Sequence, residues 1–329
     1  MQLTSSQEKM LTGRQYGLAG KQGAVQICEW TKKSLRDQDE CYKNKFYGVK
    51  TYSCAQITPN VLTCDQNCIF CWRPAEMYNT KKISKKEAIN PKELVDKLVK
   101  KRRLLLIGFK GYEKVNQKKL KASIDGFPKH WAISLSGEPT LYPYLPELVK
   151  EIKKKGAESI FIVTNGQNPE MFQKLKEKKA LPSQLYLSLT AYDPKSYVQI
   201  NRGISQDGFK SLKKSLNLLK TLKVRSVIRV TLIKDYNTQK EQLEKLAKLI
   251  EGSGADFVEV KAYMWIGDSR KKLGQENMPL FSEIKDYSKI LLKNLKSYKC
   301  ENDCEASRII LLKNKGSKYK TKLIIEDNS

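Results

Sequence analysis

The amino-acid sequence predicts an α/β protein: a partial (βα)6 TIM-like barrel that follows an N-terminal extension and is closed by a C-terminal β-hairpin. Three observations lead to this fold class. From about residue 88 the chain alternates helical and strand patterns, which predicts a parallel sheet with right-handed crossovers. About six strands are found, fewer than the eight of a closed TIM barrel. The first 50 or so residues carry no such alternation.

Each predicted element has its own signal. The first helix of the repeating part begins at Asn90, a residue type that caps helix N-termini, with Pro91 at the first helical position. The strands are short runs rich in apolar residues, separated by apolar positions that recur at helical spacing. We expect strands at 55–62, 130–137, 159–166, 184–191, 226–234 and 256–264, and helices at 90–103, 145–156, 169–179, 209–222 and 242–252.

These elements divide the chain into three regions. Residues 1–54 form an extension that packs on the barrel rather than a separate domain, because no low-complexity linker follows them. Residues 55–299 form the (βα)6 core. In the closing region, 300–329, we expect a hairpin between segments 307–314 and 319–327, which the turn-forming sequence Lys-Gly-Ser-Lys separates.

The charge of the chain points to a polyanionic partner. Lys and Arg number 62 against 35 Asp and Glu, a formal net charge of +27 spread along the whole sequence. Nucleic acid is the first candidate for such a partner, although a lysine-rich composition also accompanies genome bias or thermophily. No signal peptide and no long apolar run is found, so we expect a cytoplasmic protein, monomeric and with no membrane partner.

Three cysteines are crowded into the segment "TCDQNCIFCWRP", at Cys64, Cys68 and Cys71. In a reducing compartment such cysteines favour metal binding over disulfides. Zinc normally takes four ligands, and the only histidine of the chain, His130, lies far away in the sequence and precedes a predicted strand, so we expect it to be structural. Three thiolates on a four-iron cubane cluster instead leave one iron open to an outside ligand.

Polar loops follow several predicted strands and are expected to share one edge of the sheet with the cysteine segment. In parallel α/β folds the carboxyl ends of the strands form the functional face. The loops lie at Ser136-Gly137-Glu138-Pro139, at Thr164-Asn165-Gly166, at Ser188 to Tyr192 and at Tyr263 to Gly267.

The Cys-x3-Cys-x2-Cys spacing together with these loops resembles the radical S-adenosylmethionine (SAM) superfamily. Alone, the spacing would also suit a chance occurrence or a zinc knuckle, and Ser-Gly-Glu-Pro an ordinary turn. The resemblance implies a 4Fe-4S cluster on Cys64, Cys68 and Cys71, whose open iron is chelated by SAM. It further implies SAM contacts from Phe70, Ser136, Gly137, Glu138, Pro139, Thr164, Asn165, Ser188 and Thr190.

A second set of cysteines, Cys28, Cys41 and Cys54, is spaced evenly by thirteen residues. They could be buried as small hydrophobic residues, but three thiols without a nearby histidine favour a second 4Fe-4S cluster with an open iron. The runs "CYKNKFYGVKTYSCAQITP", "INRGI" and "VEVKAYMWIGDSRKKL" resemble the archaeal tRNA 4-demethylwyosine synthases of wybutosine biosynthesis, over essentially the whole chain.

That resemblance implies an enzyme of the carbon–carbon lyase class. Its substrate is tRNA-Phe with N1-methylguanosine at position 37, on the 3′ side of the anticodon, and it condenses this base with two carbons of pyruvate to give 4-demethylwyosine. A 5′-deoxyadenosyl radical made from SAM takes a hydrogen atom from the N-methyl group. Because the flavodoxin domain fused to eukaryotic relatives is absent here, we expect an external one-electron donor of the flavodoxin or ferredoxin type.

Lys43 matches the lysine of that family that forms a Schiff base with pyruvate, although it could equally serve only to position pyruvate. Other residues in matching stretches are candidates for contact with RNA or substrate, and each could instead be an ordinary solvated charge or a core aromatic residue. Cys300 and Cys304 have no assigned role. The candidates for contact with RNA or substrate are Asn201, Arg202, Arg229, Lys261, Tyr263, Trp265 and Arg270.

Two other functions fit part of this pattern. One is a different RNA-directed radical SAM enzyme, such as a methylthiotransferase or a methyltransferase, which would not require pyruvate. The other is a non-catalytic iron-sulfur or zinc protein that binds RNA, which would not cleave SAM. The Ser-Gly-Glu-Pro loop argues against the second function, because a binding module needs no chelation site for an amino acid.

Overall fold

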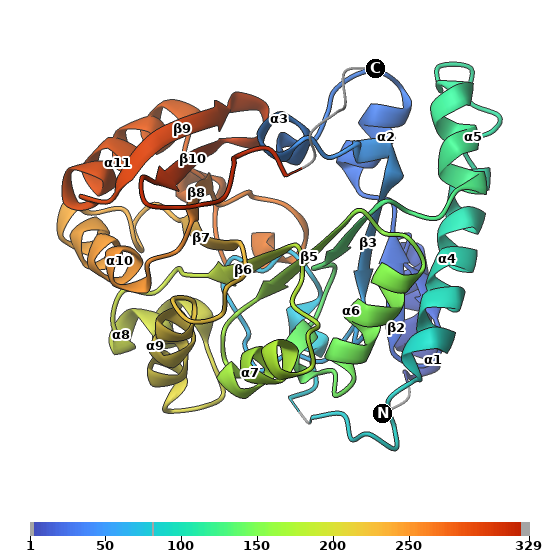
Figure 1. The fold of residues 1–329 in the computed structure, drawn as a ribbon, viewed down its shortest axis with the longest axis horizontal. Helices are drawn as coiled ribbons and strands as arrows, with labels where there is room; N and C mark the ends of the chain where they lie inside the picture. Colours follow the sequence, from blue (N-terminus) through green and yellow to red (C-terminus); the bar gives the residue numbers. More distant parts are fainter. Residues whose placement is uncertain (1–2, 81, 324–329) are drawn as a thin grey trace.

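A ten-stranded mixed sheet runs through the chain (Figure 1). The structure is a computed structural model that describes residues 3–80 and 82–323. The six strands β3 to β8 are parallel and follow the chain order, as the sequence predicts, whereas the strands at both ends of the sheet pair antiparallel. The strands, whose order in the sheet is β1-β2-β3-β4-β5-β6-β7-β8-β10-β9, are β1 (Gly17–Ala19), β2 (Gly23–Gln26), β3 (Cys54–Thr58), β4 (His130–Ile133), β5 (Ser159–Thr164), β6 (Gln184–Ser188), β7 (Ser226–Leu232), β8 (Phe257–Ala262), β9 (Tyr298–Cys304) and β10 (Ile309–Asn314).

Long helices cover one face of this sheet. They are α4 (Pro91–Ile107), α6 (Leu145–Lys154), α7 (Pro169–Glu177), α9 (Gly208–Leu218), α10 (Lys240–Ser253) and α11 (Phe281–Asn294). The other helices are α1 (Ser5–Gly13), α2 (Glu29–Leu35), α3 (Tyr42–Tyr47), α5 (Gln117–Asp125) and α8 (Pro194–Ser196), with a π-helical turn η4 (Tyr197–Asn201) and 3-10 turns η1 (Thr51–Ser53), η2 (Ala75–Met77), η3 (Pro139–Leu141), η5 (Gly267–Lys271), η6 (Gln275–Asn277) and η7 (Glu305–Ser307). Among the described residues, no helix combines the length and the apolar character that crossing a membrane requires.

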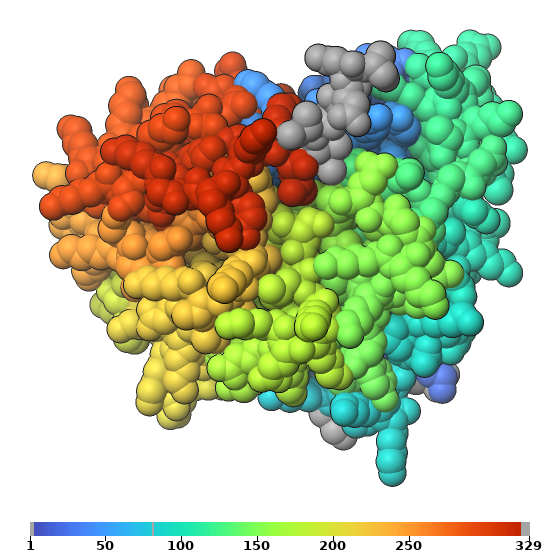
Figure 2. Space-filling view, in the orientation of Figure 1, coloured from blue at the N-terminus to red at the C-terminus, as the bar shows by residue number. Residues whose placement is uncertain are grey.

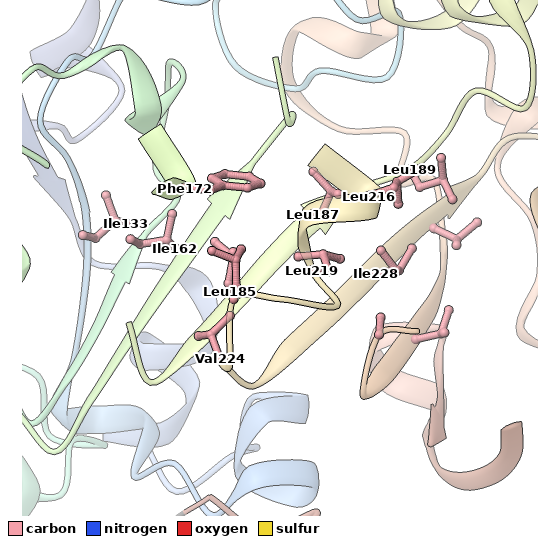
Figure 3. Packing of buried hydrophobic residues seen from close by; sticks show 14 of the residues in the cluster. Ile133, Ile162, Phe172, Leu185, Leu187, Leu189, Leu216, Leu219, Val224 and Ile228 are labelled. Carbon is pink, nitrogen blue, oxygen red and sulfur yellow. The ribbon is translucent and has the colours of Figure 1, made fainter. Parts of the chain in front are cut away.

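Side chains alternate between the two faces of the parallel strands, because successive residues of a strand point to opposite sides. The residues that face the helices are even-numbered in β5 and β7, such as Ile162 and Ile228, and odd-numbered in β6, such as Leu187. Figure 3 shows Ile162, Leu187 and Ile228 packed against Phe172 of α7 and Leu216 of α9 on the helical face. The opposite, inner face carries a different set of side chains and packs against the short helix α3. Its apolar members are Phe161, Tyr186, Val227, Phe257, Ile309 and Leu311.

The N-terminal extension takes part in the sheet. Strands β1 and β2 form an antiparallel hairpin, and β2 then pairs with β3, so the sheet begins within the first 54 residues. These strands span only three and four residues, too few to show an alternating pattern in the sequence. The predicted strand 55–62 is shorter than expected and ends at Thr58, because Pro59 has no N–H group to continue the ladder.

The C-terminal hairpin of the structure is formed by β9 and β10, so the prediction that 307–314 pairs with 319–323 is wrong. Strand β10 pairs with β9 on one side and with β8 on the other, so its apolar run is interior to the sheet rather than at the edge. Within the second predicted strand, residues 319–323 form no strand, and 324–327 lie outside the described residues. The sequence pattern does not predict β9, because its residues "YKCENDC" are mostly polar, as suits an edge strand. Figure 2 shows the end of the described chain, orange-red to red, lying against the orange segment before it.

Candidate active site

The cysteine segment forms a long loop directly after β3, at the carboxyl ends of the parallel strands. Backbone hydrogen bonds tie it to the end of the π-helical turn and to the residue that follows this turn: Ile69 N donates to Ile200 O at 2.9 Å, and Asn67 N donates to Arg202 O at 3.2 Å. At its far end, Cys64 N donates to Asn79 O at 3.2 Å. The loop is thus closed on itself and anchored to the loop after β6, as the shared edge of a parallel sheet predicts.

The thiols of Cys64, Cys68 and Cys71 are free and half-buried. Burial raises the pKa of each thiol. The neighbouring Asp65 raises the pKa of Cys64 further, and Cys71 does the same for that of Cys68. The three thiols are therefore protonated at neutral pH, and a bound metal would have to displace their protons.

Polar side chains from outside the triad approach each of these thiols. Asn165 Nδ2 donates to Cys64 Sγ at 4.0 Å, and Asn201 Nδ2 donates to Cys68 Sγ at 3.8 Å. The Cys68 thiol also donates to Gln66 Oε1 at 3.3 Å, and Tyr78 Oη lies 3.9 Å from Cys71 Sγ. These contacts tie the triad to the loops after β5 and β6 and to other parts of the cysteine loop itself.

No group of three or more His, Cys, Asp or Glu side chains in the described part of the chain is already closed around a metal position. The donor chemistry nevertheless suits a 4Fe-4S cluster. Three free thiols lie within eight consecutive residues of one loop, and the only histidine of the chain, His130, is distant in sequence. Such a set supplies three iron ligands and leaves the fourth iron open.

The loop Ser136-Gly137-Glu138-Pro139 lies against the start of the cysteine loop. Gly137 has φ +70°, and a Cβ at this position would lie 2.2 Å from Asn60 O and 2.6 Å from Thr63 O. The side chain of Asn60 donates to Glu138 O at 2.7 Å, and Ser136 Oγ donates to Val61 O at 2.6 Å. Only glycine allows this close approach, so the two loops form one unit.

The carboxylate of Glu138 is fully engaged within the protein. Its Oε1 accepts hydrogen bonds from Thr140 N at 3.0 Å, Thr140 Oγ1 at 2.7 Å and Thr164 Oγ1 at 2.6 Å, and its Oε2 accepts one from Asn165 N at 2.8 Å. Burial, followed by the charge of Asp65, raises its pKa to about 7 against these hydrogen bonds. Glu138 therefore joins the loops after β4 and β5.

The remaining predicted SAM contacts also lie at this edge. Ser188 ends β6 and is half-buried, and Thr190 Oγ1 donates to Asn201 Oδ1 at 3.1 Å. Phe70 is half-buried beside the apolar cluster of Ile69 and Tyr263. The structure thus brings the predicted SAM-binding residues and the first cysteine triad to one edge of the sheet.

The second cysteine triad gathers around the inner face of the sheet. Cys28 precedes α2, Cys41 precedes α3, and Cys54 begins β3. Burial raises the pKa of Cys41 to about 11, where the attraction of Lys43 opposes it and the charge of Cys28 adds to it. Burial raises the pKa of Cys54 as well, with further contributions from Cys28 and Cys41. The three thiols therefore lie within electrostatic reach of one another.

Lys43 lies on α3 next to this triad. Its Nζ is 4.3 Å from the ring centroid of Phe161 and 5.2 Å from that of Tyr186, both on the inner face of the sheet. Burial, and then the positive charge of Arg229, lowers the pKa of this ammonium group. The site therefore holds a half-buried amine against two aromatic rings.

Most of the residues predicted to contact RNA or substrate do not lie on an open surface. Arg229 and Lys261 belong to the inner face beside Lys43, which favours a small substrate over a tRNA phosphate. For Tyr263 the expectation of a stacking surface is wrong: only 1% of the residue is exposed, its ring packs in an apolar cluster, and its hydroxyl donates to Ser269 Oγ.

The others lie nearer to solvent. Trp265 is half-buried: its Nε1 donates to Leu273 O at 3.0 Å, and the exposed Arg270 guanidinium lies 4.6 Å from its ring. Asn201 is buried near Cys68, whereas Arg202 is exposed. Only Arg202 and Arg270 of the predicted set are therefore fully exposed.

Sequence reasoning missed several residues that shape these sites. Tyr78 approaches Cys71 and hydrogen-bonds the Ser136 loop, and Asn60 fixes the loop at Glu138. Neither carries a local signal. Glu259 could have been found, because a carboxylate within the apolar strand "FVEVKA" is unusual and indicates a buried ion pair.

Comparison with known proteins now adds to this geometry. Residues 61–250 match the sequence model of the radical SAM superfamily, and residues 253–314 match that of wyosine base formation. The SAM-dependent tRNA 4-demethylwyosine synthase of Pyrococcus abyssi is 42% identical over 90% of this chain and 85% of its own length. The enzyme of that name from Methanocaldococcus jannaschii is 40% identical over 96% of this chain and 98% of its own length. The chain belongs to the tRNA 4-demethylwyosine synthase family.

Solved structures agree with membership of this family. A structure of TYW1 with a lysine–pyruvate adduct bound superposes with a TM-score of 0.86, at 37% identity, over 98% of this chain and 100% of that one. A crystal structure of archaeal TYW1 superposes with a TM-score of 0.79, at 35% identity, over 97% and 99% of the two chains. As radical SAM enzymes, tRNA 4-demethylwyosine synthases are expected to use SAM and a 4Fe-4S cluster.

Proposed function

We propose that this enzyme converts N1-methylguanosine at position 37 of tRNA-Phe to 4-demethylwyosine, with SAM as cofactor and pyruvate as donor of two carbons. The observation that carries the proposal is the half-buried Lys43, held against two aromatic rings beside three free thiols. A solved relative with a lysine–pyruvate adduct has the same fold at 37% identity. An amine in a partly desolvated site suits a carbonyl substrate.

In this proposal Cys64, Cys68 and Cys71 hold the first 4Fe-4S cluster. When bound, that cluster and SAM supply a carbon radical that takes hydrogen from the N-methyl group of the base. The residues around it position SAM. The half-buried Phe70 offers a ring for the adenine, and the Gly137 turn offers backbone groups at the edge shared with Thr164, Asn165, Ser188 and Thr190. Because its carboxylate is engaged, Glu138 acts by fixing the two loops.

The second triad, Cys28, Cys41 and Cys54, would hold a further 4Fe-4S cluster on the inner face. The donor set is again three free thiols, which suits a cluster with one open iron. Lys43 would bind pyruvate there: its Nζ attacks the ketone carbon, and water leaves as the Schiff base forms. The rings of Phe161 and Tyr186 exclude water from one side of the adduct.

The tRNA would approach the edge of the sheet where the cysteine loop lies, which in this proposal is the mouth of a partial (βα)6 barrel. Exposed aromatic and basic side chains lie there: 42% of Trp72 is exposed, and Arg202 and Arg270 are open to solvent. A net charge of +27 supplies the attraction to phosphates. We propose that the enzyme acts as a monomer and takes electrons from an external one-electron donor.

The test is a reconstituted reaction. The full chain is loaded anaerobically with iron and sulfide, reduced with dithionite, and given SAM and tRNA-Phe bearing N1-methylguanosine, with or without pyruvate. Mass spectrometry of the nucleosides should show 4-demethylwyosine only when pyruvate is present. SAM cleavage without a pyruvate-dependent product would overturn the proposed function, and it would leave membership of the radical SAM superfamily intact.

A further inference from the structure

The inner face of the sheet beside Lys43 carries more positive than negative charge. The cations are Lys43 on α3, Arg229 on β7 and Lys261 on β8, and the carboxylate among them is Glu259. Strand register explains the grouping. Arg229 lies opposite Glu259 in the parallel pair β7 and β8, and Lys261 follows two residues later on the same face of β8.

The side chains of Arg229 and Glu259 form an ion pair with each other. The Arg229 guanidinium donates to Glu259 Oε2 from Nη2 at 2.8 Å and from Nε at 3.1 Å, and Nη2 also donates to Tyr42 Oη at 2.6 Å. The other oxygen, Glu259 Oε1, accepts from Tyr47 Oη at 2.7 Å. Glu259 itself is completely buried, so this network is a fixed structural unit and leaves no carboxylate oxygen for a lysine.

Lys261 is left without an anionic partner. Its recorded contact is with the ring of Tyr42, whose centroid lies 5.4 Å from Nζ, and no ion pair joins Lys261 to a carboxylate among residues 3–80 and 82–323. Burial, and then the charge of Arg229, lowers the pKa of this group, and the smaller effect of Lys43 acts in the same direction, whereas Glu259 and Cys41 oppose the shift. A half-buried ammonium ion beside two other cations is unfavourable unless a ligand supplies a negative charge.

We propose that Lys261 is the residue that recognises the carboxylate of the 2-oxo acid held by Lys43. The inference rests on the proposed function and assigns a substrate-binding role to a residue of the strand opposite α3. Tyr42 links the two lysines: it precedes Lys43 in the chain, and its ring lies beside Lys261. The Arg229–Glu259 ion pair fixes the hydroxyl of Tyr42, and with it the ring that lies beside Lys261.

This arrangement explains why the ligand would be a small carboxylate. The amine of Lys43 forms the bond to the ketone carbon, Lys261 pairs with the carboxylate, and the rings of Phe161 and Tyr186 face the methyl group. A tRNA phosphate is disfavoured here, because this face is covered by α3 and packs against it. The Lys261 ammonium thus positions the substrate and selects for its charge.

The experiment measures capture of the substrate on Lys43. The full chain, reconstituted with iron and sulfide, is incubated with increasing pyruvate or with its neutral ester, methyl pyruvate, in the presence of cyanoborohydride. The Lys43 amine and the ketone lose water to form an imine, hydride from cyanoborohydride reduces the imine to a secondary amine, and peptide mass spectrometry gives the modified fraction. The variants are Lys261→Met, Lys261→Arg and, as a matched control, Lys45→Met. Lys45 lies two residues from Lys43 but is exposed and pairs with Asp303.

Lys261→Met should raise the half-saturating concentration of pyruvate about tenfold or more and leave that of methyl pyruvate unchanged. Lys261→Arg should leave the half-saturating concentration of pyruvate close to that of the original chain. Lys45→Met should change the half-saturating concentration of neither pyruvate nor methyl pyruvate. If Lys261→Met shifts neither substrate, or shifts both equally, the inference is wrong and the proposed function stands. If the original chain captures no pyruvate on Lys43, the assignment of Lys43 fails, and this inference fails with it.

Discussion

At the scale of single residues, the environment of a side chain decides its role more than its type does. Lys43, Lys45 and Lys261 are all lysines, yet Lys45 is an exposed partner of Asp303, whereas Lys43 and Lys261 are half-buried beside aromatic rings. In the same way, Glu138 is a carboxylate that four donors already occupy. Two predictions belong to this scale.

Gly137→Ala should disrupt the loop that joins β4 to the cysteine segment. The backbone has φ +70°, and the added Cβ would lie 2.2 Å from a backbone oxygen that cannot easily move. We expect a loss of about 2 kcal/mol or more in the free energy of unfolding and a large loss of SAM cleavage. Urea unfolding and product analysis measure the two effects.

Gly111→Ala is the matched control for that change, because a Cβ at Gly111 meets no atom within 4 Å. It should leave both quantities nearly unchanged. If Gly137→Ala and Gly111→Ala change the free energy of unfolding and SAM cleavage to the same extent, the role given to the Gly137 turn is contradicted.

His130 should make the stability of the protein depend on pH. Its Nε2 accepts a hydrogen bond from Lys50 N at 3.1 Å, so its Nδ1 carries the proton toward Ser159 Oγ. Burial lowers its pKa from 6.5 to about 4, although Glu158 opposes this shift. The unfolded chain then binds the proton more tightly than the folded chain, so the stabilisation is complete above pH 6.5 and is lost as the pH falls toward 4.

Between those two pH values the contribution of His130 should amount to about 3 kcal/mol. Urea unfolding of the iron-free chain at several pH values measures it, with His130→Asn as the comparison. The variant should lose less free energy of unfolding between pH 6.5 and pH 4 than the original chain. Parallel pH profiles of the two chains would show that His130 does not titrate as described.

At the scale of elements, the two faces of the sheet have different roles: one packs against helices, and the other carries the reactive side chains. One face carries aliphatic side chains that pack on the long helices, and the other carries the aromatic, charged and thiol groups that meet α3. The loops at the strand ends hold the first cysteine triad. The segment after β8 also reaches this edge: Asp268 N donates to Trp72 O at 3.2 Å, so the C-terminal part of the chain touches the cysteine loop.

Gly267→Ala should weaken that contact. Gly267 has φ +57°, and a Cβ there would lie 2.2 Å from Trp72 O. The loop 265–271 would have to move away from the cysteine loop, and we expect product formation to fall about tenfold or more. Product analysis and thermal unfolding measure the effect.

Gly252→Ala, within helix α10, is the control for this contact, since a Cβ at Gly252 has no atom within 4 Å. It should be neutral or slightly stabilising, because alanine favours a helix over glycine. A Gly267→Ala enzyme with undiminished activity would show that the contact with Trp72 is not needed.

At the scale of the whole molecule, the chain presents two thiol triads to different parts of one sheet. The first follows β3 on the loop side, and the second surrounds the start of β3 and of α3. The strand β3 therefore separates two sites, and its length sets the distance between them. The formal net charge of +27 suits a large polyanionic partner.

The number of bound irons tests this division. The original chain should hold about eight irons after reconstitution, and alanine at all three positions of either triad should leave about four. Cys300→Ala should keep about eight, because Cys300 is exposed and lies outside both triads. Iron and sulfide analysis measures these counts. Loss of all iron when Cys28, Cys41 and Cys54 are replaced would contradict two independent sites.

Features that depend on neighbours along the chain could be predicted from the sequence. The spacing of Cys64, Cys68 and Cys71 lies within one loop, and the alternation of helices and strands follows local apolar periods, so both were predictable. The resemblance to tRNA 4-demethylwyosine synthases rested on such local runs and is confirmed. The strand-end rule also predicts that Ser136, Thr164 and Ser188 share one edge of the sheet.

Features that depend on contacts between residues far apart in the chain follow from the tertiary structure alone. The polar segment β9 is a strand because it pairs with β10, and no local sequence pattern of β9 indicates this pairing. Tyr263 proved buried, and Arg229 and Lys261 proved to face α3, because the packing of a whole sheet determines which side of a strand meets solvent. Cys41 and Cys54 lie close to Lys43 for the same physical reason: the hydrophobic contact between α3 and the inner face brings distant segments together.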